Sequence, residues 1–380
     1  MIEAPGILVT ALAFVAVIGP LVFVHEMGHY LAGRWFGIKA DAFSIGFGRE
    51  ILGFTDRRGT RWKLGWLPLG GYVRFAGDMN PASQPTAEWL SLPADERNRT
   101  FQAKPVWQRA VVVAAGPAIN LLLAVLILAC FALAYGDPQG AAVAGGVEPG
   151  SAAARAGLRP GDTVVRIADQ PVGTFQDMIA VVQPRAGRTV VIDVLRDDEP
   201  VRLEAVVATF VPEDRAGRAL HGSDGQPLRF GRLGITPAGA SPLQALGAGI
   251  RRTGEIIGTM VGALGEIVLG DRSVKDLGGP LMIAKVSGEQ MSAGVASFAF
   301  LLALISINLG FINLLPIPML DGGHLLLYAI EAARRRPVEP HVQEWAFRGG
   351  LAALLALMLL VTFNDLGAFG LWKSLAGLIG

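Results

Sequence analysis

Two histidines and a glutamate stand close together near the start of the chain. His25 and His29 are four residues apart, and Glu26 directly follows the first histidine. On an α-helix this spacing puts both imidazoles on one face, where two neutral ring nitrogens can bind one Zn²⁺. Glu26 points beside that face, so it can act as a general base without being a ligand. The pattern predicts a catalytic zinc site.

A catalytic zinc site needs a third protein ligand. The chain has five histidines and one cysteine, so a site built from several cysteines is excluded. Two candidates, Asp321 and His324, lie at the end of a long apolar stretch. Because an oxygen or a nitrogen would satisfy zinc equally well, the residues alone leave this choice open.

The composition is typical of a membrane protein. Of the 380 residues, 52% are hydrophobic and 17% are charged, whereas soluble domains carry about 25% charged residues. The net charge of +1 provides no basic surface, so no nucleic-acid partner is expected. Apolar stretches long enough for a hydrocarbon core of about 30 Å predict about four transmembrane helices. We place them within segments 1–36, 106–136, 291–330 and 345–372.

The basic residues between these segments predict how the chain crosses the membrane. Segment 37–105 and the connection between the third and fourth helices are rich in Lys and Arg, which favours the cytoplasmic side. Both termini and the long stretch after the second helix are then outside. The first and third helices both end at the cytoplasmic side, so Asp321 is expected at the same depth as His25 and His29.

The long external stretch contains a separate folded unit. Turn signals, an alanine-rich helical segment and β-branched runs predict an α+β domain over 139–210. Residues 150–162 resemble the bacterial PDZ domain, which receives a peptide carboxyl terminus as an added strand. A spacer domain with an idle groove is the alternative.

Segment 211–290 is predicted to be an extracytoplasmic linker. Within it, residues 242–269 have apolar side chains at helical spacing, interrupted by charges. This stretch is either an amphipathic helix on the outer membrane surface or a helix packed on the PDZ-like unit.

The motifs of the first and third helices together resemble those of the site-2 protease family of intramembrane zinc metalloproteases. The motifs are residues 25–29 and the run 308–323. Further matching segments are 70–73, 104–109, 116–120 and 279–280, so the resemblance covers nearly the whole chain. Within the family, the chain is most similar to the bacterial regulator of sigma-E protease group. The enterobacterial member of that group has two tandem PDZ domains, whereas this chain has room for one.

The resemblance implies an α-helical polytopic membrane protein with an inserted extracytoplasmic PDZ-like α+β domain and a membrane-associated β hairpin in 37–105. It implies Asp321 as the third zinc ligand, Glu26 as the catalytic base and His324 as a neighbour. The implied activity is regulated intramembrane proteolysis in the bacterial inner membrane. Its substrates would be the transmembrane segments of single-span proteins, such as anti-sigma factors or signal-peptide remnants. Peptide carboxyl termini at the PDZ-like domain and the lipid bilayer are the other implied partners.

A helical substrate must be unwound before attack, and its freed backbone groups then need partners. An alternating segment after a turn predicts a hairpin strand that pairs with 71–75, where the family has a membrane-re-entrant β loop. We expect four residues of this strand to bind substrate: Arg61, Trp62, Lys63 and Leu64. A cytoplasmic hairpin anchored by tryptophans is the alternative.

Three asparagines lie in the apolar helices, where an amide either binds a ligand or joins helices. We expect Asn308 or Asn313 to bind the unwound substrate, and Asn120 to pack helices together.

Two other functions compete with a protease. One is a non-catalytic, membrane-anchored PDZ receptor with a pseudo-protease core, and the presence of Glu26 and both histidines disfavours it. The other is a metal transporter, which would need ligands along a path through the bilayer rather than at one depth.

Overall fold

The computed structural model describes residues 6–77, 89, 91–213, 217–222, 225–273 and 278–368. The described chain forms two compact units. The inserted unit is Val125–Arg252, and the membrane unit is formed by the chain before and after it. Residues 1–5 and 369–372, which the sequence assigns to the first and fourth apolar segments, lie outside the described residues.

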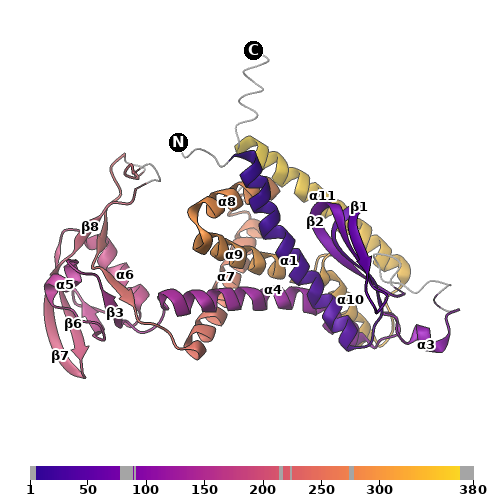
Figure 1. Ribbon diagram of the computed structural model, residues 1–380, viewed down its shortest axis with the longest axis horizontal. Helices are drawn as coiled ribbons and strands as arrows, with labels where there is room; N and C mark the ends of the chain where they lie inside the picture. The colour runs from indigo at the N-terminus through magenta and orange to yellow at the C-terminus, as the bar shows by residue number, and fades with distance from the viewer. Residues whose placement is uncertain are drawn as a thin grey trace, which may run out of the picture. The chain divides into compact units, whose positions relative to one another are not determined.

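Within the described residues, four helices are long and apolar enough to cross a membrane, judged by length and composition. These helices are α1 (Ile7–Trp35), α4 (Val106–Tyr135), α9 (Val295–Leu314) and α11 (Pro340–Ala368) (Figure 1). Many of their leucines are exposed, which suits helices that face lipid rather than water. The architecture is that of a multi-pass membrane protein.

Three helices cover the third apolar segment, 291–330, and the end of the predicted linker before it, where most of the first of them lies. They are α8 (Pro280–Ala293), α9 and α10 (Asp321–Arg334). Gly294 separates α8 from α9 with a φ of 116°, which favours glycine. Pro316 and Pro318 follow α9, and their rings are incompatible with a helix interior. The second break puts Asp321 in the first turn of a new helix.

The sheet of the membrane unit is formed by two long strands, β1 (Ala40–Thr55) and β2 (Arg61–Phe75). Both strands change register, so each contributes two paired segments. Trp62 pairs with Phe54 and Phe43, and Phe43 pairs also with Val73. The segments therefore lie in the order 50–55, 61–65, 40–45 and 71–75. Segment 61–64 is interior, whereas 71–75 forms an edge, and β2 lies beside α1 (Figure 1). A short helix, α3 (Ala94–Arg97), precedes α4.

The inserted unit is an α+β fold with its own apolar core. Its main sheet has the strand order β5-β4-β6-β7. These strands are β4 (Thr163–Ile167), β5 (Gln170–Pro171), β6 (Thr189–Arg196) and β7 (Glu199–Val206). The helices are α5 (Ala152–Ala156) and α6 (Phe175–Val182), followed by the 3₁₀ turn Gln183–Arg185. Ile167, Met178 and Ile192 are buried between sheet and helices.

Two further strand pairs complete the inserted unit, and each pair includes one strand that lies beyond residue 210. They are β3 (Ala144–Val147) with β10 (Ile235–Pro237), and β8 (Ala208–Phe210) with β9 (Phe230–Arg232). The predicted linker thus supplies two strands of this fold. Inside the unit, Arg196 donates to Asp162 at 2.7 and 2.8 Å, and this contact holds the pKa of that carboxyl below its usual value.

Residues 242–269 form a helix, α7 (Pro242–Leu269). Its first turns pack on the end of α4 through small side chains, with Ala245 and Ala248 against Ala129 and Ala132. Small side chains allow two helices to approach closely. The amino-terminal turns of α7 are therefore packed on α4 within the inserted unit.

Candidate active site

His25 and His29 lie on the face of α1 that crosses α4, and two glycines permit this crossing. A Cβ on Gly28 would overlap the carbonyl oxygen of Ala115, and a Cβ on Gly116 would overlap the His29 ring. The ring is held by its Nδ1, which donates to the carbonyl oxygen of Val112 at 2.9 Å. Because the carbonyl can only accept, the Nδ1 of His29 carries the proton and its Nε2 is available.

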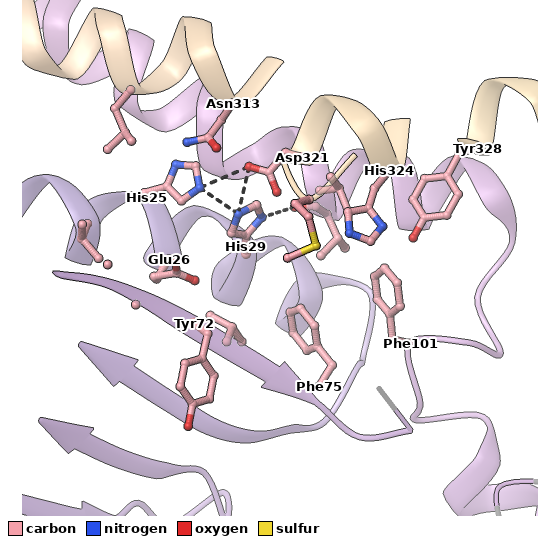
Figure 2. Close-up of a pocket in the computed structure, with 18 residues that line it drawn as sticks. His25, Glu26, His29, Tyr72, Phe75, Phe101, Asn313, Asp321, His324 and Tyr328 are labelled. Carbon is pink, nitrogen blue, oxygen red and sulfur yellow. Dashed lines mark hydrogen bonds and ion pairs between the residues drawn. The ribbon is translucent and has the colours of Figure 1, made fainter. Parts of the chain in front are cut away.

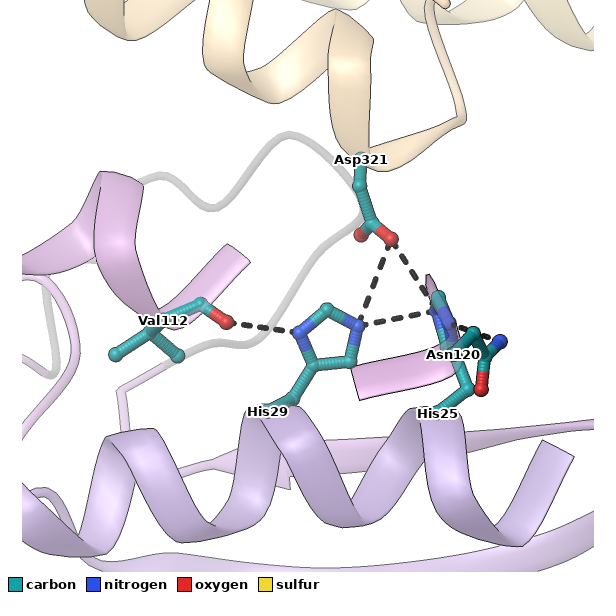
Figure 3. Close-up of polar contacts among 5 residues, drawn as sticks. All are labelled: His25, His29, Val112, Asn120 and Asp321. Carbon is teal, nitrogen blue, oxygen red and sulfur yellow. Dashed lines mark hydrogen bonds and ion pairs between the residues drawn. The ribbon is translucent and has the colours of Figure 1, made fainter. Parts of the chain in front are cut away.

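Asp321 reaches the same point from the start of α10. The turn before it is tight: Met319 has a φ of 84°, and a Cβ on Gly322 would overlap the carbonyl oxygen of Leu315. This turn directs the Asp321 carboxylate at the two imidazoles. Its Oδ2 lies 3.2 Å from Nε2 of His25 and 3.6 Å from Nε2 of His29, and the two nitrogens are 3.2 Å apart (Figure 3).

These three atoms are spaced as the ligands of one tetrahedral ion. Bonds of about 2.0–2.1 Å place neighbouring ligands of a tetrahedral zinc about 3.3 Å apart. A carboxylate oxygen and two imidazole nitrogens that face one another with their lone pairs repel unless a cation lies between them. In the described part of the chain, this is the group of His, Cys, Asp and Glu side chains that could hold a metal ion.

Glu26 lies beside the three ligand atoms and is not one of them. Its side chain is 8% exposed, and its carboxylate accepts a hydrogen bond from the backbone of Val73 in the edge segment of β2. Both residues line a cavity of about 360 Å³ with His25, His29 and Asp321 (Figure 2). The site therefore combines a possible metal-binding triad with a buried carboxylate held in place beside it.

The remaining helical candidates are distributed unevenly around this cavity. Asn313 and His324 line it (Figure 2), and the His324 ring lies against Phe347 in a tilted arrangement with centroids 4.8 Å apart. Asn308 does not line the cavity, and among the described residues its buried Oδ1 has no hydrogen-bond partner.

Asn120 has a contact that the sequence does not predict. Its backbone oxygen accepts from the hydroxyl of Ser306 on α9 at 2.7 Å. Its side-chain amide also lies 3.3 Å from Nδ1 of His25. The spacing in the sequence could have indicated this contact. Val112, Gly116 and Asn120 follow one another at intervals of four residues, so they share one face of α4.

The structure does not place the predicted substrate-binding strand at the cavity. Arg61 pairs with Glu50, Trp62 donates to Asp56 at 3.0 Å, and Lys63 lies 4.9 Å from the ring centre of Tyr72. Like Leu64, these residues are paired on both sides within the sheet, so they have no free edge. Gly70, Gly71, Tyr72, Val73 and Phe75 line the cavity instead. Substrate binding by Arg61, Trp62, Lys63 and Leu64 stays a prediction, and the edge segment 71–75 is a second candidate.

The comparison with known proteins assigns the chain to a family. The profile of peptidase family M50 matches residues 13–357. The chain belongs to peptidase family M50. It is 42% identical over 376 residues to a protein of Agrobacterium fabrum named as a zinc metalloprotease, with 93% of this chain and 95% of the relative covered. The metalloprotease MmpA of Caulobacter vibrioides is 35% identical over 403 residues, with 98% and 99% covered.

This M50 peptidase is a zinc metalloprotease of a multi-pass membrane type. The family similarity, the enzyme class and the zinc cofactor predicted from the sequence motifs are thus confirmed. A non-catalytic receptor with a pseudo-protease core is not favoured.

Proposed function

We propose that this M50 peptidase cleaves transmembrane segments of single-span membrane proteins, as in regulated intramembrane proteolysis of anti-sigma factors or signal-peptide remnants. One observation carries the proposal. His25, Glu26 and His29 lie within a helix that is apolar and long enough to cross a membrane, and Asp321 follows another such helix, α9, after the short connection 315–320. A substrate peptide bond must therefore reach these residues within the bilayer or at its border.

In the proposed mechanism, His25, His29 and Asp321 hold the zinc ion. When bound there, zinc acts as a Lewis acid that polarises the scissile carbonyl. Glu26 takes the proton of the attacking water and delivers it to the leaving amine. The hydrogen bond from Val73 keeps this carboxylate at the side of the ligands. Burial of the site limits access of bulk water. Fewer water molecules then compete with protein groups for hydrogen bonds to the unwound substrate backbone.

The edge segment 71–75 is the proposed partner of the unwound substrate backbone. It is paired with β1 on one side, and several of its residues line the cavity beside Glu26. A substrate that adds to this edge as a strand satisfies its freed backbone groups and passes next to the general base. Asn313 faces the same cavity and can bind the substrate backbone through its amide.

Disulfide cross-linking tests this strand addition. In a background with Glu26→Gln and Cys130→Ser, we expect Tyr72→Cys to cross-link to single cysteines placed along a substrate segment. Lys63→Cys is the matched control, because two strand spacings of about 4.8 Å separate its backbone from the edge, and a disulfide needs Cβ atoms about 3.5–4.5 Å apart. Cross-links at position 63 without any at position 72 would contradict strand addition at the edge. They would show instead that substrate contacts the interior segment 61–64.

We further propose that the inserted unit is PDZ-like and receives peptide carboxyl termini outside the cytoplasm, with the active site near the cytoplasmic side of the inner membrane. The basic residues of segment 37–105 support this orientation. An apolar cavity of about 230 Å³ next to α6, lined by Met178, Val182 and Leu233, supports the binding role. Titration of the whole protein with a labelled peptide checks it: Ile179→Asp, at a lining residue that is 39% exposed, should weaken binding, and equal affinity would contradict the assignment.

A single-span reporter tests the proposed function as a whole. The purified protein in liposomes should cut the reporter within its transmembrane segment, and mass spectrometry of the products should locate the bond. Cleavage confined to the water-exposed parts of the reporter would contradict the proposal.

A further inference from the structure

Asn120 is a buried side chain whose amide the proposed mechanism does not yet use. The residue has an exposed fraction of 0%, and its amide group lies 3.3 Å from Nδ1 of His25 (Figure 3). Its oxygen, Oδ1, is buried and has no hydrogen-bond partner among the described residues. A buried acceptor without a hydrogen bond destabilises the fold, so this oxygen needs an explanation.

The protonation of the His25 ring explains the unpaired oxygen of Asn120. Its Nε2 faces the ligand cluster, 3.2 Å from both Nε2 of His29 and Oδ2 of Asp321. For Nε2 to offer a lone pair to a metal, Nδ1 must carry the proton and needs an acceptor. The two ends of an asparagine amide are distinguished by their hydrogen bonds. Turning the Asn120 amide over gives this proton an acceptor and gives Oδ1 a partner.

His29 shows the same arrangement with a different acceptor. Its Nδ1 donates to the carbonyl oxygen of Val112, which lies two helical turns before Asn120 on the same face of α4. One face of α4 therefore supports both imidazoles. A separate contact joins Asn120 to α9, because the hydroxyl of Ser306, itself 0% exposed, donates to the Asn120 backbone oxygen and not to its amide.

We propose that Asn120 is a positioning residue for His25. Its side-chain oxygen accepts the Nδ1 proton, which sets the orientation and the tautomer of the ring so that Nε2 is free for zinc. This inference rests on the proposed zinc site. Groups that hold a metal-binding histidine in this way typically contribute about 10–100-fold to metal affinity.

Zinc affinity of the purified full-length protein, measured by competition with a chromogenic chelator, tests the proposal. Asn120→Leu keeps the size of the side chain but lacks the acceptor, and we expect it to weaken zinc binding by about 10–100-fold. Asn120→Asp keeps an acceptor oxygen and should bind zinc as the wild type does. Ser306→Ala is the control for packing, because it removes the contact between α4 and α9 and leaves the amide in place. If Asn120→Leu does not fold, Asn120→Ala removes the same acceptor.

The visible spectrum of the cobalt-substituted protein gives a second measurement that packing alone would not change. Asn120→Leu should alter the ligand-field bands, and Asn120→Asp should retain them. A wild-type protein that binds no zinc would overturn the proposed function itself. The inference about Asn120 alone would be overturned by wild-type affinity in Asn120→Leu, by equal losses in the Leu and Asp variants, or by an equal loss in Ser306→Ala.

Discussion

Glu26→Gln should lower cleavage of a single-span reporter by at least about 10²-fold, the lower end of what a general base contributes, while the protein keeps its zinc. The substitution preserves the size of the side chain, and an amide oxygen can still accept the hydrogen bond from Val73. An amide cannot take a proton from water at neutral pH. Because Glu26 is outside the cluster of His25, His29 and Asp321, the metal site should remain intact.

Two measurements on the same preparation separate these effects: zinc per chain by elemental analysis, and cleavage rate in liposomes. Wild-type protein stripped of metal by a chelator should lose activity and regain it when zinc is added back, whereas the variant should stay inactive in zinc. Glu344→Gln, at an exposed glutamate of α11 paired with Arg348, is the control for loss of a carboxylate. Loss of zinc from Glu26→Gln would make Glu26 a ligand, and retained cleavage would remove its role as base.

Local spacing explains why much of the site could be predicted. His25 and His29 share a helix face because they are four residues apart, and the apolar runs indicate helices by composition alone. The third apolar segment is different, because Gly294 separates its main helix, α9, from α8, and its prolines separate α9 from α10. That division positions Asp321 at the start of a helix and could be anticipated only in part from the prolines.

Contacts between distant segments could not be predicted in the same way. Segments 61–64 and 71–75 both have the pattern of a strand, and nothing in that alternation tells which is interior and which is the edge. The answer depends on β1, whose Phe43 pairs with both Trp62 and Val73. The contact of Asn120 with His25 depends likewise on how closely α1 crosses α4, which Gly28 and Gly116 determine. Local pattern therefore indicates His25 and His29 as candidate ligands, and helix packing shows which groups contact them.

Asp321→Asn should weaken zinc binding far more than His324→Ala. Asp321 Oδ2 lies 3.2 and 3.6 Å from the two Nε2 atoms, whereas His324 lines the cavity and its ring packs against Phe347. A neutral amide is a poorer ligand than a carboxylate. Closed zinc sites bind with about 10–16 kcal/mol, so one of four ligands carries on the order of 3 kcal/mol, or about 100-fold in affinity. His324→Ala should change affinity by much less, because it removes ring packing and no ligand.

Contacts that do not involve Asp321 hold α10 in place, so the Asp321 and His324 variants can be compared on the same fold. Glu331 of α10 forms an ion pair with Arg109 of α4 at 2.7 Å, and the Arg109 guanidinium lies 4.8 Å from the ring centre of Tyr328. These contacts are independent of Asp321, so α10 should stay docked when the carboxylate loses its charge. Dialysis against graded chelator concentrations, with thermal unfolding as a check on the fold, measures both variants. If His324→Ala empties the site while Asp321→Asn leaves zinc bound, His324 is the third ligand and Asp321 only orients the histidines.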